Sequence, residues 1–343
     1  ELHDPDVPYD RENGNDHHFS EKMIERVIVG SPKNAAYFQP VLQEFSVGTY
    51  HSAGSTLVFI AMHVDDPENL VAQVLGFQSR ENGANTSASM LRSILFGLNK
   101  VDGDAARKQL ENALGKSYLA PYTVDLISSV GVDDHLFSLL IERLRTGELS
   151  PWNAQSLGFR AEFKDVSPKL ISELIDVLLA SGAEGAWAAI DFLTYLLHEK
   201  RELSTDEARL LKRAALHETL FSREQFGHMD AYHWKELINK LFIHDLSDKE
   251  FAEDCTRFIT ALINVPEYSV QLNFNNYARD ILCRTIDAYP EAVWRVYIEQ
   301  GTLNDPVKDH RLRSLYGTDI GNPSHAGVLA HMPMSIVEPW MLE

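Results

Sequence analysis

Residues 167–182 read SPKLISELIDVLLASG, and their apolar side chains recur every three or four positions. This spacing places them on one face of an α-helix, whereas a half-buried strand alternates at every second residue. Pro168 follows Ser167 at the first helical position, where the missing amide hydrogen of proline costs nothing. The apolar face comprises Leu170, Ile171, Leu174, Ile175, Leu178 and Leu179. We therefore predict an amphipathic helix that buries this face against its neighbours.

The same periodicity recurs along most of the chain, in residues 90–98, 136–144, 251–263 and 274–286. No segment shows alternating strands separated by hairpin turns, although Leu57–Val64 could compete as a buried strand. The sequence therefore predicts an all-α protein.

Helix start signals support this prediction. Ser204 with Glu207 fits a capping box, in which each side chain satisfies a free backbone amide of the other residue. The acidic pairs Asp65-Asp66 and Asp133-Asp134 stand directly before apolar runs, where carboxylates cap helices and complement the helix dipole. These pairs are therefore interpreted as helix caps and not as acid-base residues.

The helix starts recur at a regular interval in the second half of the chain. They fall near residues 167, 185, 204, 229, 247, 273 and 289, so a helix pair recurs about every 37 to 44 residues. This period is typical of HEAT-type hairpins, which bury their apolar faces by stacking on neighbouring hairpins. We predict an irregular HEAT-like helical-hairpin solenoid, and a right-angled helical domain is the alternative.

Composition and charge exclude several classes of protein. The 343 residues include 31 Lys and Arg against 50 Asp and Glu, a formal net charge of −19 that disfavours wholesale nucleic-acid binding. No apolar run approaches the roughly 20 residues that span a bilayer. The two cysteines, Cys255 and Cys283, provide no disulfide framework and fit the reducing cytoplasm. Residues 1–19 are expected to form a flexible acidic linker, and residues 20–343 a helical-repeat domain that is a fragment of a longer chain.

Familiar catalytic, nucleotide-binding and metal-binding motifs are absent from the sequence. It contains no phosphate-binding glycine loop, no zinc-protease motif and no serine-nucleophile elbow. His228, His233 and His244 come nearest to a metal site, but the spacing of five between the first two places them on different helical faces. Both cysteines fall on apolar stripes. We therefore predict no catalytic residue, no cofactor and no metal site, and an enzyme without a recognisable motif is retained as an alternative.

Two features point instead to a binding partner. Arg209 and Arg213 are four residues apart and would present two planar donor groups from one helix face to an anionic partner. Arg311 and Arg313 belong to a second basic cluster, and Trp234 is one of the large aromatic residues that could mark a contact. These five residues are the predicted partner-binding residues.

The segment GVLAHMPMSIVEPWM, residues 327–341, resembles a recurring ending of helical-repeat regions in large bacterial defence proteins. In those proteins a proline-led helix carries a tryptophan after a short apolar run, here Pro333 and Trp340. The helical body resembles the C-terminal HEAT-like sensor region of STAND-type anti-phage proteins in general pattern. The resemblance implies the sensor part alone, because the sequence contains no effector motif.

The hypothesis from the sequence is thus a recognition or scaffold module, with a role in antiviral defence as its narrower form. Its partner would be another protein or the missing part of its own chain. A nucleic-acid-binding solenoid is the second hypothesis, which requires the two basic clusters to meet on one face.

Overall fold

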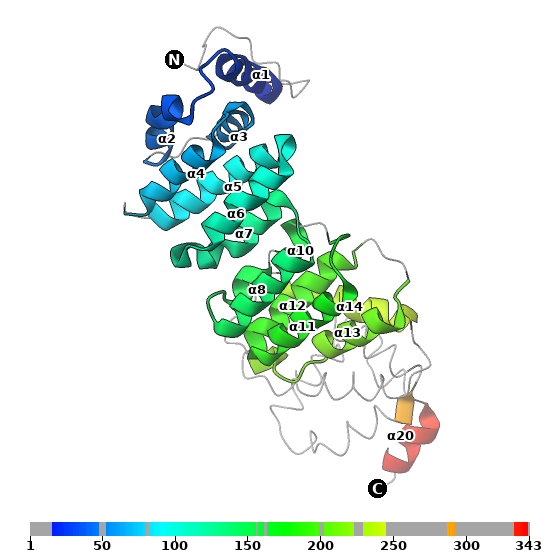
Figure 1. The fold of residues 1–343 in the computed structure, drawn as a ribbon. Helices are drawn as coiled ribbons and strands as arrows, with labels where there is room; N and C mark the ends of the chain where they lie inside the picture. The colour runs from blue at the N-terminus through cyan, green and yellow to red at the C-terminus, as the bar shows by residue number, and fades with distance from the viewer. Residues whose placement is uncertain are drawn as a thin grey trace. The chain divides into compact units, whose positions relative to one another are not determined.

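The structure, a computed structural model, describes residues 16–47, 53–79, 83–155, 157–160, 163–198, 202–222, 229–244, 287, 289–291 and 333–341. Within these ranges the regular structure is helical and contains no strand, which confirms the all-α prediction. The α-helices are α1 (Asp16–Val29), α2 (Gln39–Phe45), α3 (Ala53–His63), α4 (Pro67–Leu75), α5 (Gly83–Val101), α6 (Gly103–Leu114), α7 (Thr123–Val130), α8 (Asp134–Thr146), α9 (Pro151–Gln155), α10 (Leu157–Arg160), α11 (Pro168–Ala180), α12 (Gly182–Leu196), α13 (Thr205–Ala215), α14 (Asp230–His244) and α20 (Met334–Met341) (Figure 1). In the same ranges the structure has the 3₁₀ helices η1 (Ala35–Phe38), η2 (Gly76–Ser79), η3 (Ser117–Tyr122) and η4 (Leu220–Ser222).

The chain divides into two compact units. The first comprises Glu1–Asn153 with Arg160–Val166, and the second Ala154–Phe159 with Ser167–Glu343. Residues 1–15 of the predicted linker lie outside the described ranges.

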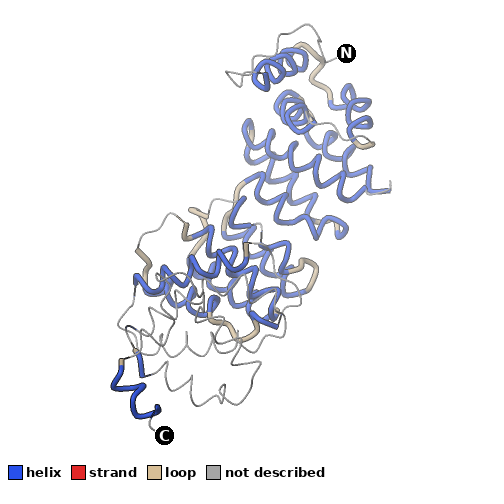
Figure 2. Tube along the Cα trace, turned by 180° about the vertical axis from the view of Figure 1, so that it is seen from behind, coloured by secondary structure: helices blue, strands red, loops and turns tan. Residues whose placement is uncertain are grey.

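Helices of the first unit pack on the helix two places further along the chain (Figure 2). α1 contacts α3, α3 contacts α5 and α5 contacts α7, while α2 contacts α4 and α4 contacts α6. From α4 to α8, neighbours in the chain also pack on one another, as α5 does on α6. The largest fully buried side chains of the first unit are Leu42, Ile60, Leu70, Leu91, Ile94, Leu95, Leu110 and Phe137.

A glycine allows α3 and α5 to approach closely. A Cβ atom at Gly97 would lie 2.5 Å from the Val58 carbonyl oxygen and 2.9 Å from the Ala61 Cβ. Because any larger residue would meet the backbone of α3, the α3–α5 contact depends on this position.

A buried arginine joins three helices of the same unit. The guanidinium of Arg143, on α8, donates to the Thr123 hydroxyl at the start of α7 and to the Leu114 carbonyl at the end of α6. Residue Arg143 is only 8% exposed. Its donors therefore satisfy buried backbone and hydroxyl acceptors to which water has little access.

The second unit is built around α12, which contacts α11, α13, α14 and η4. Every residue from Gly185 to Thr194 is buried, so this helix is enclosed on all sides. Two buried indoles link the surrounding elements: Trp187 donates to the Leu220 carbonyl and Trp234 to the Ala215 carbonyl, both at 2.8 Å.

Several local predictions are confirmed by these helices. The stripes in residues 90–98, 136–144 and 167–182 lie on α5, α8 and α11, and Leu57–Val64 belongs to α3 and its C-terminal flank, not to a strand. The helices predicted at residues 251–263 and 274–286, with Cys255 and Cys283, lie outside the described residues. In the part of the chain that the structure describes, no helix has both the length and the hydropathy needed to cross a membrane.

Candidate partner-binding surface

The start of α13 is fixed by its capping box. The Glu207 amide donates to the Ser204 hydroxyl at 3.3 Å, and the Glu207 carboxylate accepts from the Ser204 amide at 2.9 Å. This reciprocal pair confirms the predicted helix start and sets the register of the helix.

The register turns the two predicted arginines of α13 toward solvent. The buried face consists of Leu210, Leu211, Ala214 and Ala215. Arg209 pairs with Asp206 at 3.0 Å, and their side chains are 66% and 83% exposed. Arg213 pairs with Asp176 of α11 at 2.5 Å, with side chains 46% and 52% exposed. Both guanidiniums therefore have an acidic partner within the chain, and such exposed pairs contribute about 0–1 kcal/mol each.

An open pocket adjoins Arg213 where α11 and α13 end. Its volume is about 480 Å³, and it is lined by Asp176, Leu179, Ala180, Arg213, Leu216, His217 and Glu218. The His217 Nδ1 lies 2.9 Å from the Thr219 hydroxyl oxygen. Burial lowers the pKa of His217, so its imidazole is neutral at pH 7. The sequence prediction included Arg213 but missed the other six residues, because they meet only through the packing of two helices.

Of the other predicted residues that the structure describes, Arg209 and Trp234 do not line this pocket. Trp234 is 1% exposed and packs in the core of the second unit, so its predicted contact with a partner has no support from its position. Arg311 and Arg313 lie outside the described residues.

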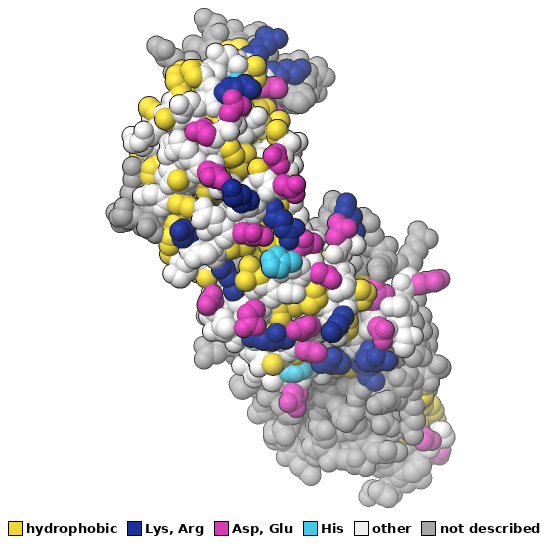
Figure 3. Space-filling view, viewed as in Figure 1, with side chains coloured by type: hydrophobic (Ala, Val, Ile, Leu, Met, Phe, Trp, Pro, Cys, Tyr) yellow, Lys and Arg dark blue, Asp and Glu magenta, His cyan; other side chains and the backbone are white. Residues whose placement is uncertain are grey.

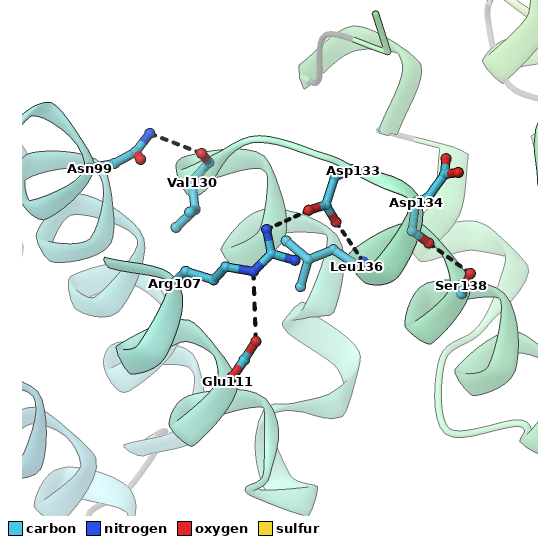
Figure 4. Close-up of polar contacts among 8 residues, drawn as sticks. All are labelled: Asn99, Arg107, Glu111, Val130, Asp133, Asp134, Leu136 and Ser138. Carbon is cyan, nitrogen blue, oxygen red and sulfur yellow. Dashed lines mark hydrogen bonds and ion pairs between the residues drawn. The ribbon is translucent and has the colours of Figure 1, made fainter. Parts of the chain in front are cut away.

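A second polar cluster lies in the first unit (Figure 4). Asp133 caps α8 by accepting from the Leu136 amide at 3.0 Å, and it also accepts from the Arg107 guanidinium of α6. The Nε atom of Arg107 lies 3.7 Å from a carboxylate oxygen of Glu111. The hydrogen bond from Arg107 is the main cause that lowers the pKa of Asp133 below its ordinary value of 3.8. The cluster thus confirms the predicted cap and gives it a partner from another helix.

Asp133→Ala is expected to destabilise the first unit by about 1 kcal/mol, because it removes the cap of α8. Asp133→Asn keeps a capping oxygen but not the charge, and is expected to cost less than half as much near pH 7. Urea unfolding monitored by circular dichroism measures both.

The sign of the pH dependence follows from the lowered pKa of Asp133. Its charge stabilises the fold above the unfolded pKa, and this stabilisation is lost as the pH falls through the folded pKa. The difference between the wild type and Asp133→Asn should therefore shrink on acidification. A difference that grows below pH 4 would contradict the assignment.

A buried polar network ties three helices of the second unit together. Asp191 of α12 is 1% exposed and accepts from Gln155 of α9 through one carboxylate oxygen. Its other oxygen lies 2.5 Å from Nδ1 of His233 on α14. The rings of Tyr195 and His233 pack in an edge-to-face arrangement, with their centroids 5.6 Å apart. His233, one of the histidines considered as metal ligands, thus faces the carboxylate of Asp191. The described residues contain no cluster of three or more side chains that could hold a metal ion.

Exposed apolar side chains are unevenly distributed over the first unit. α1 carries Met23 and Val27, α3 carries Met62 and α5 carries Phe96, each between 38% and 59% exposed. In the described structure α4 and α6 expose no large apolar side chain. The face drawn in Figure 3 shows basic and acidic side chains interspersed, with apolar patches between them.

Comparisons with protein-family models, curated proteins and solved structures found no match to this chain.

Proposed function

We propose that this chain is a HEAT-like helical-hairpin solenoid that serves as a recognition or scaffold module for another protein. The alternating contacts in the first unit support this arrangement. α4 with α5 and α6 with α7 are successive helix pairs that pack internally, and α4 packs on α6 while α5 packs on α7.

The observation that carries the proposal is the apolar surface of α1, α3 and α5. These three helices contact one another in succession, and each exposes at least one large apolar side chain to solvent. Large apolar side chains exposed on helices that pack on one another are typical of contact sites. Aromatic side chains at such sites carry much of the binding energy.

Phe96 is the aromatic residue of the proposed surface. Its side chain is 45% exposed on α5, and the Lys100 ammonium lies 4.6 Å from its ring centroid. The cation reduces the freedom of the ring without covering it completely, which lowers the entropic cost of using the ring in an interface.

Phe96→Asp is expected to reduce recovery of the partner at least about tenfold in affinity capture from lysate of the native host, after nuclease treatment. Quantitative mass spectrometry measures the recovery. The resemblance of residues 327–341 to defence sensors adds one comparison, in which a partner specific to phage-infected lysate supports the sensor form of the proposal.

Tyr37→Asp is the matched control. Tyr37 is an aromatic residue that is 55% exposed, but it lies on η1 and not on the three helices of the proposed surface. Circular dichroism should show that both variants fold. If every captured protein is recovered equally with Phe96→Asp and Tyr37→Asp, the proposed surface is wrong.

A further inference from the structure

The pocket at the ends of α11 and α13 combines an apolar floor with a charged rim. Leu179, Ala180 and Leu216 supply the apolar lining, and Asp176 and Glu218 supply carboxylates. Its volume of about 480 Å³ falls within the range of sites that hold small molecules or single side chains. An occupant must therefore offer both an apolar stem and a polar head.

The charges of the lining favour a cation. Arg213 supplies one positive charge, which Asp176 balances at 2.5 Å. Glu218 makes no ion pair with any residue that the structure describes, so its carboxylate charge is not compensated. His217 adds no positive charge at pH 7, because burial lowers its pKa. The pocket is consequently negative overall.

The ends of two helices add to this negative potential. α11 ends at Ala180 and α13 ends at Ala215, and both ends adjoin the pocket lining. Helix C-termini carry a partial negative charge that attracts cations. The last turn of α11 contains no basic residue to offset that charge, whereas the last turn of α13 contains Lys212 and Arg213.

From this geometry we infer that the pocket binds a basic side chain of a protein partner, with its methylene stem against the apolar floor and its cationic head between Asp176 and Glu218. The Arg213–Asp176 pair already shows how a guanidinium meets this carboxylate. The inference depends on the proposed function only for the statement that the cation belongs to a protein. The two arginines Arg209 and Arg213 alone predict an anionic partner, whereas this pocket favours a cationic group of the partner.

A monovalent probe tests the pocket without requiring the partner. N-acetyl-arginine amide, added at constant ionic strength and pH 7, is expected to shift the backbone amide signals of Leu179, Leu216 and His217 with a millimolar Kd. N-acetyl-citrulline amide has nearly the same shape without the charge and should bind at least about threefold more weakly. Equal binding of the two probes, or no shift at these amides, would overturn the inference.

Three variants identify the groups that bind. Glu218→Gln should weaken binding of the arginine probe about threefold, whereas Arg213→Ala should strengthen it about threefold by freeing Asp176. Asp206→Asn, the control, removes a carboxylate from α13 outside the pocket and should leave the Kd unchanged. Weaker binding of the arginine probe to Arg213→Ala would overturn the inference, because removing a positive charge cannot weaken the binding of a cation held by Asp176 and Glu218. Because the probe replaces the partner, a failure here is distinct from a failure of the Phe96 surface.

Discussion

Gly185→Ala is expected to lower the free energy of unfolding of the second unit by about 3 kcal/mol, the upper part of the usual range for overpacked cores. A Cβ atom at Gly185 would lie 1.8 Å from the Leu178 carbonyl oxygen and 2.9 Å from the Ser181 Cβ. Alanine favours a helix over glycine by about 1 kcal/mol, but this gain is too small to offset the displacement of a backbone carbonyl. The shift of the urea midpoint, followed by tryptophan fluorescence, measures the effect.

The severity of this clash comes from the short connection between two helices. α11 ends at Ala180 and α12 begins at Gly182, whose φ of +76° turns the chain within two residues. The first turn of α12 therefore packs directly on the last turn of α11. Since α12 contacts α11, α13 and α14, separating it from α11 disturbs the packing of all four helices.

Gly76→Ala is the control for the helix preference of alanine. Gly76 has φ −64° at the end of α4, and no atom lies within 4 Å of the position of an added Cβ. We expect no loss of stability, or a gain of about 0.4–1 kcal/mol from the reduced entropy of the unfolded chain. If Gly185→Ala and Gly76→Ala unfold at the same urea concentration, the close approach of α11 and α12 is not present in solution.

Local features of the fold could be predicted from the sequence because local spacing determines them. On α8 the predicted stripe is buried in full, and Asp133 caps the helix as its position indicates. The stripe of α11 is buried at Leu174, Ile175, Leu178 and Leu179. Leu170 and Ile171 at the start of this stripe are half-buried. The helix α12 is different: apolar residues surround it, so no periodic stripe marked it as the centre of a unit.

The candidate sites were less predictable because they depend on how helices dock. Arg213 was selected for its spacing from Arg209, but its partner Asp176 lies 37 positions earlier in the chain. The pocket with His217 forms only when the ends of two helices meet. Trp234 was selected as a large aromatic residue, and no local pattern distinguishes a buried indole from an exposed one.

The network around Asp191 is the second feature for which we expect a large effect. The carboxylate is buried, and it accepts from Gln155 and from the Nδ1 side of His233. Removing it leaves two donors in the core without their acceptor, and water has little access to either. The cost therefore exceeds that of the lost packing of one small side chain.

Asp191→Ala is expected to lower the free energy of unfolding by about 3–5 kcal/mol, as is typical when one partner of a buried polar pair is removed. Asp176→Ala is the matched control, because it breaks an exposed pair with Arg213 and should cost at most about 1 kcal/mol. A double-mutant cycle with His233→Ala should give a coupling energy of about 0.5–3 kcal/mol, measured from urea unfolding of the four proteins. If Asp191→Ala costs no more than Asp176→Ala, or if the coupling is zero, the carboxylate does not hold α12 to α14. A large coupling would mean that the buried Asp191–His233 pair helps to specify the contact between α12 and α14.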